Sequence, residues 1–527
     1  MSRAALGNER ADAPAVVPQD DTPGALVLVV GAGPTGVLAA IELARRGVRV
    51  RIIEQQEGPF AGSRAKGVQP RTLEIFEDIG VIDEVLASGG TFPRWRSYQG
   101  AELAWEKSIY QLIGIAEPRR QPSTPYPETW MIPQGRTEEI LRAALRRLGV
   151  EVEYATRLVA LENEAGGVTA TIEQRGQPRR VRASYALAAD GARSTARKLL
   201  GVAFEGETRE DDRFLIADVR TGDLDRTYWH NWSSPSAPGE RVSVCPLPCT
   251  DVFQYVAPIP AGEPAPALAL ETIQAIFDAR SGRSDVRFAE APWITLHRTN
   301  VRLASRYRVG RVFILGDAAH APPAAGGQGM NMSLQDSYNL AWKLAAVLRG
   351  APDPLLDTYE QERRAIAARL AGVPLSAEDP EEKPDIFQLG ISYRRSAISR
   401  EARAAPGAVQ AGDRAPDAPV HVDGSTSRRL FDLMRGVHFT CLVFNAGLAS
   451  DCAAVSERWR AIADVRVVDV SQQDAASLDL VREIYGVGNH DGVMFLIRPD
   501  GYVGLAADDR AGDRLDEYLH ELLAPQA

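Results

Sequence analysis

One glycine-rich turn constrains the fold more than any other feature of this sequence. The apolar run Leu26–Val30 leads into Gly31-Ala-Gly33-Pro-Thr-Gly36, which opens a helical stretch, and Arg49–Ile53 follows with the alternation of a second strand. Strand, glycine turn, helix and strand in this order form a βαβ unit, so we expect a parallel sheet. The glycines permit a tight turn and a close approach of the backbone to a pyrophosphate. The sequence therefore predicts a dinucleotide-binding domain near its start.

Glu54 supports the same interpretation. It ends the second strand, roughly 20 residues after the turn, where an acidic side chain accepts hydrogen bonds from a ribose. The free N–H groups at the start of the helix would face the phosphates. The alternative is a purely structural turn, since glycine-rich turns are common.

Two further turns follow apolar strands. Asp190-Gly-Ala-Arg-Ser194 comes directly after one strand, and its simpler explanation is a helix cap at Ser194 with a solvated Arg197. Gly316-Asp317-Ala-Ala-His320 follows another strand, and a segment with three more glycines then opens a long helix. An acidic side chain at a strand end can bind ribityl hydroxyls, and a helix start can place its positive end near a reduced flavin.

Size and charge limit the partners. A chain of 527 residues predicts about three folding units. The net charge of -10 disfavours nucleic acid. Ala25–Ala44 is apolar, but its glycines, Pro34 and Glu42 divide it into strand, turn and helix, so we expect no membrane span. Four scattered cysteines and the lack of a signal-like start predict reduced thiols and a cytoplasmic protein.

Changes in composition suggest the domain boundaries. We expect an α/β protein with a discontinuous Rossmann-like domain, an inserted antiparallel sheet that faces the substrate, and a small C-terminal α/β domain. The expected ranges are 1–24 for a disordered leader, 25–211 and 299–403 for the first domain, 212–298 for the inserted sheet, 404–419 for a linker and 420–527 for the last domain.

Taken together, the three turns resemble those of the FAD-dependent aromatic hydroxylases, the single-component monooxygenases that act on phenols and aromatic polyketides. The resemblance extends from about Leu26 to Arg364. Leu389-Gly-Ile-Ser-Tyr393 and Arg498-Pro-Asp-Gly-Tyr502 resemble the phenol and polyketide hydroxylase branch, whose extra domain is thioredoxin-like. That domain lacks Cys-x-x-Cys here, so we expect it to be structural, in keeping with contacts in a homo-oligomer.

The resemblance implies which residues contact FAD. Those for the ADP half are Gly31, Gly33, Pro34, Thr35, Gly36, Glu54 and the neighbouring Gln55, with Arg64 near the pyrophosphate and Leu158 at the adenine. Gln134 would contact the flavin, and Asp190 would serve both FAD and the nicotinamide cofactor. The ribityl chain and isoalloxazine ring would be held by Asp317, Gly326, Gly327, Gly329, Met330 and Asn331. The chain departs from the family pattern at Ala324, where relatives have a second proline beside the flavin.

The resemblance also implies the reaction. NADPH or NADH would reduce FAD, O2 would form a flavin C4a-hydroperoxide, and its distal oxygen would hydroxylate a phenolic or polycyclic aromatic substrate. The alternatives are a Baeyer–Villiger-type or epoxidising oxygenase of the same fold, a non-oxygenating reductase, and a flavin-binding sensor without activity.

No catalytic base emerges from the sequence. Tyr228, His230, Trp232 and Tyr255 lie in the expected substrate sheet, but each is more simply explained as a core or surface aromatic residue. His320 is better explained by packing or capping than by acid–base chemistry. We expect no metal site.

Overall fold

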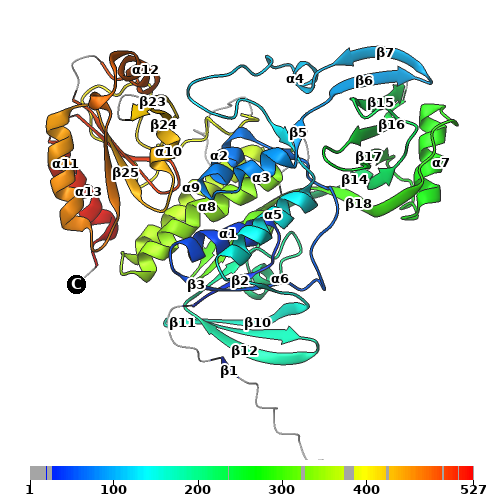
Figure 1. Ribbon diagram of the computed structural model, residues 1–527. Helices are drawn as coiled ribbons and strands as arrows, with labels where there is room; N and C mark the ends of the chain where they lie inside the picture. The colour runs from blue at the N-terminus through cyan, green and yellow to red at the C-terminus, as the bar shows by residue number, and fades with distance from the viewer. Residues whose placement is uncertain are drawn as a thin grey trace, which may run out of the picture.

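The computed structural model in Figure 1 describes residues 19–20, 26–234, 237–321, 327–372, 385–422, 426–488, 492–508 and 510–525. These residues form a mixed α/β protein with several sheets. A central six-stranded sheet lies between a small sheet and a large sheet, both mostly antiparallel, and a C-terminal domain (Figure 1).

The central sheet is built around the predicted βαβ unit. Its strands run in the order β19-β20-β13-β2-β3-β9. The pairings β20–β13, β13–β2, β2–β3 and β3–β9 are parallel. Their bounds are Leu26–Val30 for β2, Arg49–Ile53 for β3, Val152–Glu153 for β9, Tyr185–Ala188 for β13, Arg308–Val309 for β19 and Val312–Ile314 for β20. The predicted parallel sheet is confirmed.

Apolar side chains cover both faces of this sheet, as a parallel sheet requires. Val27, Val29 and Leu187 pack against three helices, α1 (Pro34–Arg45), α5 (Gln134–Arg147) and α8 (Gly329–Leu348). Leu28 and Ala186 face the antiparallel strands β10 (Thr156–Glu164), β11 (Gly167–Gln174) and β12 (Gln177–Ala183). The first and third turns described below open helices of this layer, α1 and α8.

The large sheet has the order β21-β18-β14-β17-β16-β15-β6-β7. Its strands are β6 (Arg94–Gln99), β7 (Glu102–Lys107), β14 (Phe204–Arg220), β15 (Tyr228–Ser234), β16 (Ala237–Pro246), β17 (Val252–Ile259), β18 (Glu290–Ala304) and β21 (His320–Ala321). The expected range 212–298 is too narrow for this sheet, because β6 and β7 join it from far earlier in the chain and β14 and β18 extend past both ends. The helix α7 (Leu270–Ser281) covers one face.

The C-terminal domain contains a five-stranded sheet in the order β22-β28-β27-β25-β26. The strands are β22 (Arg400–Glu401), β25 (Phe439–Val443), β26 (Val465–Asp469), β27 (Met494–Ile497) and β28 (Val503–Ala507), and the helices are α10 (Leu430–Met434), α11 (Ala446–Trp459), α12 (Ala475–Tyr485) and α13 (Ala511–Leu523). The sheet and α13 share a core with Trp342 and Ala346 of α8. This domain therefore packs directly on the helix whose N-terminus belongs to the third turn.

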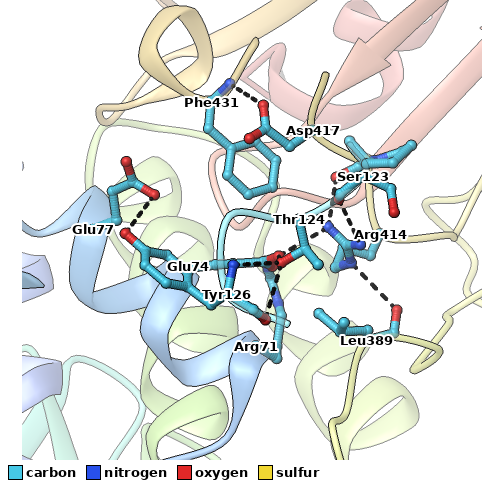
Figure 2. A network of polar contacts seen from close by, with 12 residues as sticks. Arg71, Glu74, Glu77, Ser123, Thr124, Tyr126, Leu389, Arg414, Asp417 and Phe431 are labelled. Atoms are coloured by element: carbon cyan, nitrogen blue, oxygen red, sulfur yellow. Dashed lines mark hydrogen bonds and ion pairs between the residues drawn. The ribbon is translucent and has the colours of Figure 1, made fainter. Parts of the chain in front are cut away.

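A polar network joins the C-terminal domain to the helix α2 (Pro70–Asp78), as Figure 2 shows. Arg414 donates to the Glu74 carboxylate at 3.2 Å and to the carbonyl oxygens of Ser123 and Leu389. The segment 404–419 was expected to be a linker. Its residues Ala411, Ala415 and Ala418 are instead buried in the core of the C-terminal domain. Because Arg414 of the same segment bonds Glu74, the segment also forms part of the contact between that domain and α2.

The leader was expected to be disordered over residues 1–24. Gln19–Asp20 instead forms a short strand, β1, parallel to β12. The other leader residues lie outside the described part of the chain. Among the described residues, no helix combines the length and apolar character of a membrane span. Cys245, Cys441 and Cys452 are buried and Cys249 is exposed, and none of the four forms a disulfide.

Candidate functional site

Three turns meet at one edge of the central sheet, because β2, β13 and β20 are parallel neighbours and each turn follows the carboxyl end of its strand. A Cβ atom on Gly31 would lie 2.3 Å from the carbonyl oxygen of Ala189, beside the second turn. A Cβ atom on Gly316 would lie 2.6 Å from Thr35 Oγ1. The three motifs that were predicted separately therefore form one site, in the position where parallel α/β sheets bind ligands.

Gly33 distinguishes this site from a structural turn. A Cβ atom on Gly36 would collide with the Gly31 carbonyl oxygen at 1.9 Å, so internal packing explains Gly36. Nothing lies within 4 Å of a Cβ atom on Gly33, whose φ of -69° suits any residue. No side chain caps the N-terminus of α1. Open space beside uncapped N–H groups fits a phosphate-bearing cofactor such as FAD.

Glu54, at the carboxyl end of β3, faces the same turn. Its carboxylate accepts hydrogen bonds from the backbone N–H groups of Ala32 and Gln56, each at 2.9 Å. These bonds orient the carboxylate and leave its remaining lone pairs free for a ribose. Gln55 is exposed next to it, whereas Leu158 is a buried residue of β10.

Asp190 serves as a helix cap. Its carboxylate accepts hydrogen bonds from Ser194 Oγ at 2.5 Å and from the N–H groups of Thr195 and Ala196 at the start of α6 (Thr195–Leu199). Ser194 also caps this helix, through the N–H of Arg197. Arg197 was expected to be solvated in that case, and this was wrong. It is buried and donates to the carbonyl oxygens of Ala192 and Ala318, which joins the second turn to the third.

The structure brings Arg64 and Asp317 together, although more than 200 residues of sequence separate them. Their side chains form an exposed ion pair at 3.8 Å. Gln134, the first residue of α5, accepts a hydrogen bond from Ala65 N at 3.1 Å and donates to Glu138 at 2.9 Å. Gln134 thus holds the Arg64 loop against α5 and contributes to the site by positioning it.

The third turn ends at the start of α8. Gly329 and Met330 open this helix, and no side chain caps it. Asn331 donates to the carbonyl oxygens of Gly67 and Gly327 and accepts from Gln69 N at 2.8 Å. Its amide therefore fastens strand β4 (Gly67–Val68) to the helix start. Gly327 is exposed with a positive φ of 62°. Gly326 and Ala324 lie outside the described residues.

A buried ion pair supports the third turn from behind. Asp336 of α8 accepts hydrogen bonds from Gly316 N at 3.0 Å and from His320 Nε2 at 2.7 Å, and pairs with Arg363 at 2.8 Å. Burial alone would raise the pKa of Asp336, but His320 and Arg363 outweigh it and lower that pKa. His320 is thus a packing residue, in line with the sequence-based interpretation.

One face of the large sheet turns toward this edge. Because strand side chains alternate, the paired residues Trp293, Asp218, Gln254 and Cys245 lie on one face of neighbouring strands. Ser63, one residue before Arg64, donates through Oγ to Asp218 and accepts from Gln254 Nε2 at 3.1 Å. We call this surface the flavin-side face.

The aromatic residues singled out in the sequence lie mostly elsewhere. Trp232 and Tyr255 are buried on the opposite face with Phe277 of α7. His230 shares their face of β15 and bonds the Asp225 carbonyl oxygen at 2.6 Å. Tyr228 packs under Arg96. The core or surface explanation is confirmed for these four residues.

Comparison with known families decides the class of protein. A family described as FAD binding domain matches residues 25–372, and one described as aromatic-ring hydroxylase, C-terminal, matches residues 409–525. The chain belongs to the FAD-dependent aromatic monooxygenases. The resemblance based on three turns is therefore confirmed, and the monooxygenase carries the additional C-terminal domain of its branch.

Relatives cover nearly all of this monooxygenase. A flavin-dependent monooxygenase of Mycobacteroides abscessus is 41% identical over 501 residues, which cover 94% of this chain and 99% of the relative. A pentachlorophenol 4-monooxygenase of Sphingobium chlorophenolicum is 30% identical, with 95% and 97% covered. The crystal structure of aklavinone-11 hydroxylase with FAD and aklavinone is similar with a TM-score of 0.80 at 29% identity, with 95% and 99% covered.

Three residues of the monooxygenase at this edge escaped the sequence analysis. Trp229 stacks on Trp95 at 4.3 Å on the flavin-side face. His297, on the same face of β18, has its pKa lowered by burial and by Arg64. Lys66 lies over the Trp229 ring. Strand parity would have placed Trp229 opposite Trp232, but no local signal marks Lys66 or His297. Among the described residues, no cluster of His, Cys, Asp or Glu could hold a metal ion.

Proposed function

We propose that this monooxygenase hydroxylates a phenolic or polycyclic aromatic compound, with NAD(P)H as reductant and O2 as oxidant. One observation carries the proposal: the edge where the three turns meet faces the flavin-side face of the large sheet, through the contacts of Ser63 with Asp218 and Gln254. An aromatic substrate between the two would lie against the flavin and against Trp229 and Trp293.

The described residues fit FAD. The pyrophosphate would be held by Gly33, the uncapped start of α1 and Arg64, and the ribose by Glu54. Asp317, the ion-pair partner of Arg64, would hold the ribityl chain, and the uncapped start of α8 the pyrimidine edge. When bound, FAD supplies the redox chemistry and the oxygen transfer described above. The protein keeps the reacting groups aligned and excludes water.

Further parts of the proposal rest on the resemblance. We infer that the large sheet forms the substrate domain and that the C-terminal domain is thioredoxin-like. We also infer that the protein is a cytoplasmic enzyme and that it forms a homo-oligomer through contacts of the C-terminal domain. The names of the relatives, which refer to pentachlorophenol, 6-methylpretetramide and anhydrotetracycline, support both phenols and fused-ring compounds as test substrates.

The decisive experiment measures NAD(P)H oxidation by the FAD-loaded protein against a panel of phenols and hydroxylated fused-ring compounds. We expect at least one compound to accelerate oxidation and to gain one oxygen atom from labelled O2. Acceleration without label in any product would identify a reductase. FAD binding without accelerated oxidation by any compound would favour a flavin-binding sensor.

A further inference from the structure

The amine of Lys66 lacks a hydrogen-bond acceptor of good geometry among the described residues, although the Cys245 thiol lies close enough to act on it electrostatically. Its Nζ atom lies 3.8 Å from the centroid of the Trp229 ring. Solvent does not reach this nitrogen, and it makes no hydrogen bond to any of the described residues. Buried polar nitrogens are usually bonded, so this amine can still form a hydrogen bond with a ligand that reaches it.

Lys66 stands between the two halves of the proposed site. Arg64, two residues earlier, pairs with Asp317 of the third turn. Gly67, the next residue, accepts a hydrogen bond from Asn331 at the start of α8. Trp229, which lies under the amine, belongs to the flavin-side face. A ligand that reaches Nζ would therefore contact both the flavin edge and the substrate sheet.

The surroundings of Lys66 favour its neutral form. Burial lowers the pKa of Lys66, and the Cys245 thiol of β16 and the Asp218 carboxyl of β14 offset only part of this effect. The pKa values of both neighbours are raised by burial, to about 6 for Asp218. At any given pH, a larger fraction of Lys66 than of an ordinary lysine is therefore the free amine, and the Trp229 ring would stabilise the ammonium that forms when it takes a proton.

We propose that Lys66 is a catalytic base that takes the proton of an acidic hydroxyl on the aromatic substrate and then holds the oxyanion. The proposal rests on the proposed function. The O–H bond breaks, its electron pair stays on oxygen, and the proton forms an N–H bond with the free amine. The product is an ammonium–phenolate pair, which satisfies the unbonded nitrogen and makes the ring electron-rich for hydroxylation.

Binding to the oxidised, FAD-loaded protein tests this proposal without turnover. Each phenol of the panel is titrated beside its own methyl ether, and the visible absorbance of bound FAD reports binding. We expect at least one phenol to bind roughly tenfold or more tightly than its ether, as a hydrogen bond to a charged group implies. In Lys66→Met this preference should disappear, while the affinity for the ether stays unchanged.

Two further variants separate the base from simpler explanations. Lys107→Met makes the same change at an exposed lysine that also lies over a tryptophan, Trp105 at 5.4 Å, and should keep the preference. His297→Gln tests the other proton acceptor on the flavin-side face. Lys66→Met should also melt no lower than the wild type, because an apolar group replaces an unpaired buried one.

The outcomes are distinct. A wild type without preference for any phenol, or one that binds no phenol, overturns the role of Lys66. A preference that persists in Lys66→Met, or that disappears only in His297→Gln, also overturns it. A preference that depends on Lys66 but is accompanied by no accelerated NAD(P)H oxidation supports the role of Lys66 and rejects the proposed function alone.

Discussion

At the scale of single residues, Gly33 and Gly36 occupy one turn but respond to different neighbours. Gly33→Ala places its methyl group in open space, so we expect an unchanged melting temperature of the apoprotein and roughly tenfold weaker FAD binding. Gly36→Ala drives a methyl group into the Gly31 carbonyl oxygen and should cost the apoprotein about 1–3 kcal/mol. Thermal melting and flavin fluorescence titration measure the two effects. Gly33→Ala with full FAD affinity would contradict a pyrophosphate at this turn.

Asp218 gives the apoprotein a pH-dependent stability. Burial raises its pKa to about 6, and the hydrogen bonds from Ser63 oppose this only in part. The folded-state pKa exceeds the unfolded value of about 3.9. The contribution of Asp218 to the free energy of unfolding is therefore greatest below about pH 3.9 and is lost as the pH rises from there through about 6. The loss should approach ~1.4 kcal/mol per pH unit within that window. Melting at pH 5 and pH 7 should show a smaller decrease for Asp218→Asn than for the wild type.

At the scale of elements, the alternation of side chains along β15 places Trp229 and Trp232 on opposite faces of the large sheet. Trp232 is fully buried against Phe277, with ring centroids 5.1 Å apart, so Trp232→Ala should cost about 3–5 kcal/mol of stability. Trp229 lies on the flavin-side face. Trp229→Ala should melt closer to the wild type and change which phenols accelerate NAD(P)H oxidation. A larger melting decrease for Trp229→Ala than for Trp232→Ala would reverse this assignment.

The strands also show which parts of the fold can be predicted from the sequence. The bounds of β2 and β3 match their predictions, because a continuous apolar run and a glycine turn mark them locally. The strands β6 and β7 were missed, since Arg94–Gln99 lacks a clear apolar alternation and its partner β15 lies more than 100 residues further on. The motif residues that meet at this edge carry the same local signals in the sequence. Lys66 carries none, because only its contact with Trp229 in the folded chain singles it out.

At the scale of the whole molecule, the segments 389–393 and 498–502 contact a cluster of buried charged side chains. The rings of Tyr393 and Tyr502 pack at a tilt with their centroids 4.3 Å apart, and Arg363, the partner of Asp336, donates to the Tyr393 hydroxyl at 2.9 Å. Arg498 donates to both carboxylate oxygens of Glu362, at 2.7 and 3.0 Å. The C-terminal domain is thus connected through α9 (Asp357–Leu370) to α8 and the third turn.

Arg498→Met should therefore weaken the whole protein. It leaves the carboxylates of Glu362 and Asp500 buried without their main counter-charge, which typically costs about 3–5 kcal/mol. We expect a lower melting temperature together with weaker retention of FAD. Arg458→Met is the matched control, because its pair with Asp516 is exposed and should contribute about 0–1 kcal/mol. Equal melting temperatures for the two variants would show that the buried cluster contributes little.

Under the proposed function, alternation along the strands of the large sheet assigns substrate recognition and folding to different residues. One set of residues packs against α7 in the hydrophobic core, and another set forms the flavin-side face. The two sets alternate along the same strands. Mutations that change substrate range can therefore accumulate on one side without opening the hydrophobic core on the other. For laboratory evolution, this means that a library restricted to the flavin-side positions of β14 to β18 should yield a high fraction of folded variants.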